Sequence, residues 1–337
     1  MSGVRALGLL SGGLDSALAA RLLIDQGIEV IGLHLESPTA CRSSVSDVAA
    51  HLGIRLITRH KGEAYAQLLR APRFGYGRNM NPCVDCRIFM FEMAKPVMEE
   101  CGARFLFTGE VMGQRPMSQT RERFSLIDRE SGLAGWILRP LSALALGESE
   151  PERRGWVDRS RLLGIAGRGR DTQLKLAASL GLEHHQSPGG GCLLTDPIFS
   201  VKLRDLFQHA GAEGGTLSDI ELLRIGRHFR IAEDLKIVIG RDAGENARLR
   251  ELAAMNRHVV EPDGFGGPTA MLCGALDARS LGHAARLILS FAPKAGPEAR
   301  LKWRDRGLEI GGRLADIVSE LPDPAAVDSR LIESHAT

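Results

Sequence analysis

The loop Ser11-Gly12-Gly13-Leu14-Asp15-Ser16 combines glycines, hydroxyls and one carboxylate in an order that suits an anion site. It follows an apolar run and opens a segment with helical spacing, so its backbone N–H groups would lie at a helix N-terminus. The glycines allow a ligand to approach the backbone, and Ser11 and Ser16 add hydroxyl donors for phosphate oxygens. Asp15 suits a Mg²⁺ ion or a helix cap. A strand-to-helix turn without a ligand is the alternative, and the missing Gly-Lys-Ser/Thr ending excludes the Walker loop.

Three of the six cysteines stand in settings that suit chemistry. Cys83 and Cys86 form a Cys-x-x-Cys just before an expected helix, a position that favours a nucleophile or a metal ligand. Cys192 follows three glycines, whose backbone can approach an inorganic group and donate to its sulfurs. Together the three thiols can hold a [4Fe–4S] cluster with one iron open to a substrate sulfur. A free thiol in a flexible turn is the alternative for Cys192.

The other thiols and the acid beside the pair have plainer interpretations. Cys41, Cys101 and Cys273 lack such a setting and are expected to be packing residues. Asp85 lies between the two cysteines of the pair, where it is either a general base or a solvated helix cap.

Alternating strands and helices are expected to position these residues. Apolar runs predict strands at 4–10, 29–35, 55–58 and 104–108, and helical spacing predicts helices at 14–26, from 43 or 44 to 53, and at 88–101. This alternation is typical of an α/β fold with a doubly wound parallel sheet. Ligands of such sheets bind beyond the carboxyl ends of the strands. We therefore expect three segments to line one pocket: 11–16, 34–37 and 109–120.

The second half of the chain predicts a smaller α+β domain, with a helix from Leu217, a strand at 235–239 and a helix at 245–254. The boundary is expected near residue 210, giving domains at 1–210 and 211–337, the second of unknown role. The first domain would include an arginine-rich extension at 147–170. That extension is either a solvated helical face or a patch that binds phosphates.

The overall composition fits a soluble globular protein, with 44% hydrophobic and 25% charged residues among 337. A net charge of +2 is too small to indicate a nucleic-acid binder by itself. The sequence has no secretory signal and no apolar stretch of membrane-spanning length. These features predict a cytoplasmic protein with reduced thiols.

The hexapeptide Ser-Gly-Gly-x-Asp-Ser at 11–16, placed after the first strand, resembles the phosphate loop of the PP-loop ATP pyrophosphatases. Members of that family cleave ATP between the α and β phosphates and adenylate a carbonyl oxygen. The resemblance implies that Ser11, Gly12, Gly13, Asp15 and Ser16 bind the departing pyrophosphate together with Mg²⁺. It also implies that His34-Leu35-Glu36 lies near adenine.

Other segments resemble the tRNA-thiolating branch of that family. Residues 108–114, followed by Ser118-Gln119-Thr120, resemble a block of the tRNA 4-thiouridine synthetases, in which Gly109 and Gln114 are expected to contact the nucleotide. Residues 81–86 resemble the segment that bears the catalytic cysteine of tRNA 2-thiouridylases, with Cys86 at that position. The Cys-x-x-Cys with the distant Cys192 resembles the cluster-dependent tRNA thiolases. No RNA-binding domain precedes the loop, so RNA recognition is expected from the arginine-rich extension or the C-terminal half.

The resemblance implies an ATP-dependent tRNA sulfurtransferase that releases AMP and pyrophosphate. Its cofactors would be ATP, Mg²⁺ and a [4Fe–4S] cluster held by Cys83, Cys86 and Cys192. Sulfur, supplied as sulfide or by a persulfide-carrying protein, would sit on the open iron or as a persulfide on Cys86 or Cys192. Asp85 would assist these two catalytic cysteines. Two alternatives remain open: a sulfur insertase or amide ligase for a small molecule, and an Fe–S or nucleotide sensor without turnover. A homodimer is also left open.

Overall fold

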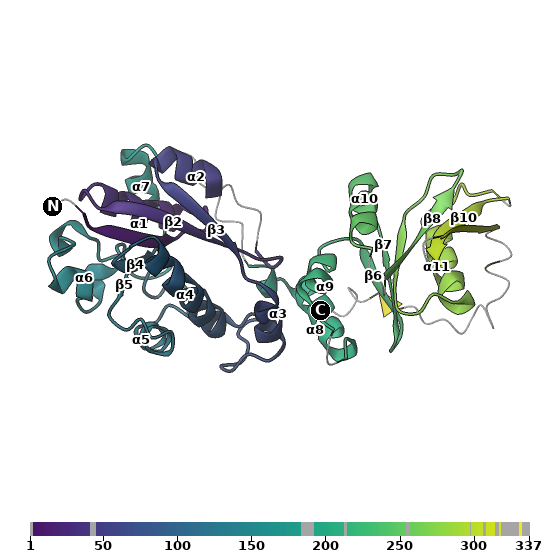
Figure 1. The fold of residues 1–337 in the computed structure, drawn as a ribbon, viewed down its shortest axis with the longest axis horizontal. Coiled ribbons are helices and arrows are strands. Elements are labelled where there is room, and N and C mark those ends of the chain that lie inside the picture. The colour runs from purple at the N-terminus through teal and green to yellow at the C-terminus, as the bar shows by residue number, and fades with distance from the viewer. Residues whose placement is uncertain are drawn as a thin grey trace. The chain divides into compact units, whose positions relative to one another are not determined.

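The computed structural model describes residues 3–40, 45–182, 192–211, 214–253, 257–296, 298–305, 308–313, 317 and 330–331. The chain divides into two compact units, Met1–Thr195 and Asp196–Thr337 (Figure 1). The division falls before helix α8 (Pro197–His209), whereas the sequence suggested a boundary after it, near residue 210. Ion pairs from Asp205 to Arg230 and Lys236 attach α8 to the second unit, and such long-range contacts leave no local sequence signal.

A five-stranded parallel sheet forms the centre of the first unit, in the order β3-β2-β1-β4-β5 (Figure 1). Its strands are β1 Arg5–Leu9, β2 Glu29–Glu36, β3 Arg55–His60, β4 Phe105–Thr108 and β5 Ile137–Leu138. The sequence predicted the first four of these strands. Their parallel pairing confirms the doubly wound α/β class. The strand order reverses beside β1, which is where sheets of this kind bind their ligands.

Helices cover both faces of this sheet, as a doubly wound fold requires. Helices α1 (Leu14–Ile24), α2 (Val45–Leu52) and α7 (Asp171–Ser179) contribute to one core cluster, which includes Phe105 and Phe107 of β4. Helices α4 (Cys83–Glu100) and α5 (Arg121–Glu130) contribute to the other, which includes Leu106. Successive residues of β4 therefore point to opposite cores. The shorter helices of the unit are α3 (Glu63–Arg70), α6 (Glu150–Arg153), η1 (Ala143–Ala145), η2 (Arg159–Arg161) and η3 (Leu193–Thr195).

Helix α4 begins earlier than the sequence suggested, at Cys83 and not at Ile88. Pro82 precedes its first turn, where a helix needs no partner for a missing N–H. Cys83 and Cys86 therefore lie within the first turn of the helix, three residues apart, and not in a loop before it. Residues at this spacing share one helix face, so both thiols can line the same side of a pocket.

A seven-stranded antiparallel sheet, in the order β11-β10-β8-β9-β7-β6-β12, forms the second unit and confirms the smaller α+β fold. Its strands are β6 Arg227–Ala232, β7 Leu235–Ile239, β8 Arg257–Asp263, β9 Ala270–Cys273, β10 Arg300–Asp305, β11 Leu308–Arg313 and β12 Arg330–Leu331. Helix α11 (Ala278–Ser290) packs on the face that contains Ile237, and α9 (Leu217–Leu222) and α10 (Ala243–Glu251) pack on the face that contains Val238. Among the described residues, no helix has the length and apolarity needed to cross a membrane.

Candidate functional site

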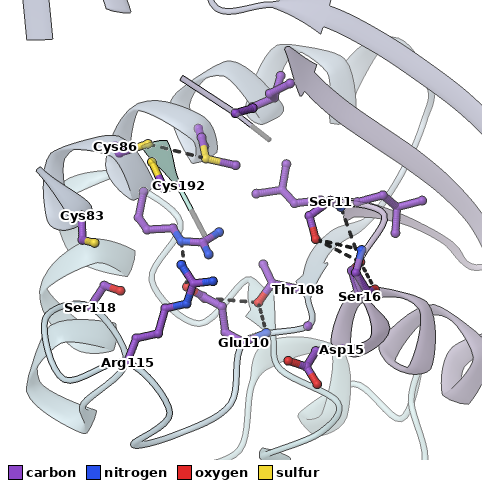
Figure 2. Close-up of a pocket in the computed structure, with 18 of the residues that line it drawn as sticks. Ser11, Asp15, Ser16, Cys83, Cys86, Thr108, Glu110, Arg115, Ser118 and Cys192 are labelled. Carbon is purple, nitrogen blue, oxygen red and sulfur yellow. Dashed lines mark hydrogen bonds and ion pairs between the residues drawn. The ribbon is translucent and has the colours of Figure 1, made fainter. Parts of the chain in front are cut away.

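One pocket opens at the carboxyl ends of β1, β2 and β4, with a volume of about 380 Å³ (Figure 2). All three segments that the sequence analysis singled out contribute to it, at 11–16, 34–37 and 109–119. The cysteines come from elsewhere: two from the first turn of α4 and one from the segment before η3. The lining includes Ser11, Gly13, Asp15, Ser16, His34, Lys61, Tyr65, Cys83, Cys86, Arg87, Gly109, Glu110, Gln114, Arg115, Ser118, Gln119, Arg170 and Cys192.

The phosphate loop is shaped by its own backbone. Gly12 has a φ of 74°, a conformation that residues with a side chain rarely adopt. The Ser16 hydroxyl donates to the Gly13 carbonyl at 2.8 Å, whereas Ser11 Oγ lies 3.4 Å from both the Gly13 nitrogen and Ser16 Oγ. The Ser11 hydroxyl is thus only weakly engaged and faces the pocket, where it can donate to a phosphate oxygen.

Gly109 allows β4 and the phosphate loop to meet. A Cβ atom at this position would lie 2.4 Å from the carbonyl carbon of Asp15 and from the nitrogen of Ser16. Contacts this short do not occur, and the atoms in the way are backbone. Close backbone packing therefore requires a glycine at position 109, in addition to the nucleotide contact that is expected there.

Asp15 faces the pocket and has two differently engaged oxygens. Its Oδ2 accepts from Gln114 Nε2 at 3.1 Å and from Arg170 Nη2 at 3.3 Å. Its Oδ1 is buried and has no hydrogen-bond partner among the described residues. A buried carboxylate oxygen without a partner is an available ligand for a hard cation. Gln114 thus lines the pocket and binds Asp15, as its place in the 109–120 segment suggested. The sequence did not distinguish Arg170 from the other arginines of the extension.

His34 lies at the edge of the pocket, near the end of β2. Its Nδ1 donates to the Leu10 carbonyl at 3.1 Å, which fixes the ring against the strand that leads into the phosphate loop. The ring is therefore oriented, and it lines the cavity where the sequence analysis expected it.

The three candidate cysteines all line this pocket. Cys86 and Cys192 lie next to each other, and Cys83 lies one helical turn before Cys86 (Figure 2). The Cys86 sulfur is 3.5 Å from Lys61 Nζ and 3.6 Å from the Tyr65 hydroxyl. Lys61 and Tyr65 are buried, and the ammonium lies 4.1 Å from the centre of the tyrosine ring. Neither residue could be predicted from the sequence, because β3 and α3 carry no motif.

Burial dominates the electrostatics of the other two thiols. It raises the pKa of Cys192 to about 11, with a further contribution from Cys86. Burial also raises the pKa of Cys83, although Arg87 and Arg115 oppose that shift. Without a bound cation, neither thiol is poised as a nucleophile at neutral pH. The three glycines before Cys192 lie outside the described residues, and the expectation that they approach a ligand stays a prediction.

Asp85 has a different position from the one expected for a base between the cysteines. Its carboxylate is buried and accepts from the backbone nitrogens of Arg73, at 2.8 Å, and Phe74, at 3.1 Å. It does not belong to the residues that line the pocket. Because α4 starts at Cys83, Asp85 points away from the thiols and holds the chain before the helix. It is therefore neither placed as a base nor a solvated cap.

A buried ion network supports the loop after β4. Arg139 lies between Glu110, at 3.1 Å, and Asp128, at 2.7 Å, and its guanidinium stacks on Phe124. Glu110 also binds Arg87 of α4 at 3.2 Å. Burial raises the pKa of Asp128 against the opposing effect of Arg139. This network joins the loop to the helix that carries the two cysteines, so it fixes one wall of the pocket.

Most arginines of the 147–170 extension are engaged within the protein. Arg153 and Arg154 bind Glu150, at 2.8 and 3.3 Å, and Arg161 donates to the Asp25 carbonyl at 2.7 Å. Arg159 binds Glu152 and two backbone carbonyls. The carbonyl contacts of Arg159 and Arg161 fasten the extension to the rest of the first unit, and the other pairs lie within the extension. Together they weaken the expectation that it is an RNA surface.

The cysteines expected to be packing residues fit that expectation where they are described. Cys101 belongs to the core cluster beneath α4, and Cys273 packs beside Met271 in the second unit. Cys41 lies outside the described residues.

Comparison with known proteins supports the sequence resemblance for the first unit. Residues 2–148 match the family model described as thiamine biosynthesis protein (ThiI). A probable tRNA sulfurtransferase from Thermococcus kodakarensis is 30% identical over 146 residues, covering 42% of this chain and 37% of that protein. A tRNA-specific 2-thiouridylase MnmA from Pelobacter propionicus is 34% identical over 111 residues, covering 30% and 31%. The chain thus spans well under half the length of these relatives. The resemblance of this part of the chain to the tRNA-thiolating branch is confirmed.

The second unit matches a different family model. Residues 226–309 match the NFACT protein RNA binding domain, in the half of the chain that the sequence named, beside the arginine-rich extension, as a possible source of RNA recognition. Among solved structures, a 4-thiouridine synthetase–RNA complex with bound ATP aligns with a TM-score of 0.34 and 19% identity, covering 53% of this chain and 52% of that one.

Proposed function

We propose that the chain is an ATP-dependent tRNA sulfurtransferase, which adenylates a nucleoside carbonyl oxygen and replaces it with sulfur. One observation carries the proposal: the phosphate loop and three cysteines, from distant parts of the sequence, line the same cavity (Figure 2). A nucleotide held at the loop and a sulfur atom held at the cysteines would face the same substrate atom. The match of residues 2–148 to the ThiI model supports this assignment.

The activation step would use the phosphate-loop side of the pocket. The pyrophosphate of ATP would bind at residues 11–16, with adenine toward His34 and with Arg170 near the phosphates. The acceptor carbonyl oxygen then attacks the α-phosphorus, and pyrophosphate leaves. The unpartnered Asp15 Oδ1 fits a Mg²⁺ ion, which would offset the charge of the leaving group.

The sulfur step would use the cysteine side. Each thiolate of a [4Fe–4S] cluster binds its own iron, so three thiols have to border one cavity and need not meet at a single point. Cys83, Cys86 and Cys192 border one, although the described residues contain no group of three side chains suited to a single metal ion. Burial raises the pKa values of Cys83 and Cys192, so a bound metal would have to displace a proton from each thiol.

A cluster held by these residues would supply an open iron for sulfur that arrives as sulfide, whereas a persulfide-carrying protein would pass its outer sulfur to a cysteine thiolate. A persulfide on Cys86 or Cys192 is the version without iron. In that version the terminal sulfur of the persulfide attacks the adenylated carbon, and AMP leaves. The other thiol of Cys86 and Cys192 would then attack the cysteine sulfur of the resulting C–S–S–Cys bond, which releases the thiolated nucleoside and leaves a Cys86–Cys192 disulfide that a thiol reductant reopens. Lys61, 3.5 Å from the Cys86 sulfur, stabilises negative charge on that side of the pocket.

The second unit would bind the tRNA. Its match to the NFACT RNA binding domain supports this role. The tRNA would then be bound by the second unit and modified in the pocket of the first. The arginine-rich extension is the weaker candidate, because most of its guanidinium groups bind carboxylates or carbonyls of the first unit. All described pocket residues come from one unit of one chain, so the proposal needs no second copy.

Pyrophosphate and AMP release, measured with and without tRNA from cells that lack the gene, tests the proposal. We expect release to depend on that tRNA, and mass spectrometry of its nucleosides to show one thiolated product. The Asp15→Asn variant should lose both signals. Release that tRNA does not stimulate, without a thiolated nucleoside, would overturn the tRNA assignment.

Iron content separates the two sulfur carriers. Anaerobically purified protein should contain about four irons and show broad visible absorption. Both should be lost in each single Cys→Ala variant at 83, 86 and 192. Full thiolation activity in iron-free protein would exclude the cluster and favour the persulfide as the sulfur carrier.

A further inference from the structure

We infer that a rim formed by Tyr76, Arg78, Arg115 and Met117, beside the cysteine side of the pocket, binds the single-stranded RNA that flanks the target nucleotide. The inference rests on the proposed function and adds the surface by which the substrate strand enters. The rim lies outside the arginine-rich extension and the C-terminal half, the two regions where the sequence suggested RNA recognition.

Two loops make up the rim and touch each other. Residues 71–82 connect α3 to α4, and residues 109–120 connect β4 to α5. A Cβ atom on Gly77 would lie 3.0 Å from Met117 Cγ, so the loops are in contact there. Arg115 belongs both to the second loop and to the pocket lining, and it lies near Cys83 and Ser118 (Figure 2). The rim is therefore continuous with the pocket.

The first loop is held in place by specific contacts. Asn79 has a φ of 58°, and its side-chain amide donates to the Thr195 carbonyl at 2.7 Å. The Gly77 nitrogen donates to the Asn81 carbonyl at 2.8 Å. Asp85 binds the backbone nitrogens of Arg73 and Phe74. These contacts tie the loop to the start of α4 and to the segment after Cys192, so its exposed side chains have a fixed relation to both cysteine-bearing segments.

Tyr76 presents its ring and not its hydroxyl. The hydroxyl donates to the Leu69 carbonyl at 2.7 Å, while the side chain remains 38% exposed. Met117 is also 39% exposed. A tyrosine whose polar end is satisfied within the protein offers a preorganised face on which a base can stack.

The charge of the rim fits a polyanion. Arg78 and Arg115 are exposed, and neither forms an ion pair with any residue that the structure describes. The acids of this area are engaged: Asp85 accepts from backbone nitrogens, and Glu130 binds Arg73 at 2.7 Å. Most of the extension arginines, in contrast, have protein partners. A nucleotide that enters the pocket as part of a strand brings its own and its neighbours' phosphates to the mouth, where Arg78 and Arg115 lie.

Binding of tRNA from cells lacking the gene, measured by filter retention over a range of salt concentrations, tests the rim. The Tyr76→Ala variant should bind about tenfold more weakly, whereas Tyr76→Phe, which keeps the ring, should bind within about twofold of the wild type. The Arg78→Ala variant should bind more weakly and lower the slope of log K against log salt by about 1. The matched control is Arg153→Ala, which removes another exposed arginine, one that is bound to Glu150 in the extension; this variant should bind like the wild type.

The outcomes separate the rim from the function that it serves. Suppose that the wild type binds and thiolates tRNA, but Tyr76→Ala and Arg78→Ala leave the affinity and the salt slope unaltered. That result would overturn the role of the rim and leave the proposed function standing. A wild type that neither binds nor thiolates tRNA would overturn the proposed function and the rim with it. Equal losses in Tyr76→Phe and Tyr76→Ala would also overturn the stacking role, because the hydroxyl contact would then be the cause. Unchanged thermal unfolding midpoints identify the losses as binding effects.

Discussion

The two sides of the pocket are built by different means. The phosphate-loop side is shaped by backbone: a glycine with positive φ, a serine bonded to a carbonyl within the loop, and a close approach at Gly109. The cysteine side is shaped by side chains from α4, from β3 and α3, and from the segment before η3. Backbone geometry predetermines where an anion binds, whereas the thiols depend on nearby side-chain cations, Lys61 beside Cys86 and Arg87 near Cys83, and on burial. The expected phosphate site is therefore preformed, whereas the proposed sulfur chemistry would depend on what is bound beside the thiols.

The largest expected effect comes from removing a thiol. Cys86→Ser and Cys192→Ser should each lower tRNA thiolation at least about 1000-fold. When the thiols hold or transfer sulfur jointly, the loss of one is expected to cost about as much as the loss of all. Pyrophosphate release should persist in both, since the phosphate-loop side does not use these thiols. Quantitative release assays beside nucleoside mass spectrometry measure the two halves separately. Cys273→Ala in the second unit is the control. Loss of pyrophosphate release in the Cys86 variant would show that the thiols are also needed for the ATP step.

The next effect comes from the close approach on the phosphate-loop side. Gly109→Ala places a Cβ atom against the backbone of Asp15 and Ser16, so loop and strand must separate. A displacement of about 1 Å at a catalytic site costs on the order of 100-fold in rate, which we expect in pyrophosphate release. Gly147→Ala is the matched control, because a Cβ atom there meets no neighbour within 4 Å. Near-normal release by Gly109→Ala would show that the loop is not rigid.

This contrast also explains what the sequence predicted and what it did not. The loop at 11–16 is contiguous, and Gln114 and Gly109 sit in a recognisable block, so their convergence followed from the parallel-sheet pattern. Lys61, Tyr65 and Arg170 have no motif and join the site only through tertiary packing. Asp85 was misplaced because the helix start was set one turn too late, which turned its carboxylate toward the thiols. The domain boundary was set after α8 because the Asp205–Arg230 pair spans 25 residues and leaves no local trace.

The thiol electrostatics predict a pH dependence on the cysteine side. Because the pKa of Cys192 is raised from 9.0 to about 11, its thiolate fraction in iron-free protein should increase tenfold per pH unit up to about pH 11. Alkylation of Cys192 by iodoacetamide at pH 7 should therefore be about 100-fold slower than that of an unfolded reference cysteine. Peptide mass spectrometry after timed quenching measures the rate, with urea-unfolded protein as the reference. A rate profile that levels off near pH 9 would contradict the role of burial.

The smallest expected effect tests the buried ammonium beside Cys86. Lys61 is buried, and its ammonium contacts the Cys86 sulfur, so Lys61→Met removes a charge-assisted contact worth about 1.5–3 kcal/mol. Single-turnover thiolation should slow by roughly tenfold or more. Lys61→Arg keeps the charge and should retain more of the rate, which distinguishes electrostatic support from simple packing beside Tyr65. Pyrophosphate release should be unaffected in both variants, because Lys61 touches only the cysteine side. If Lys61→Met instead lost pyrophosphate release and thiolation equally, the two sides of the pocket would act as one preformed unit, and the difference between them would disappear.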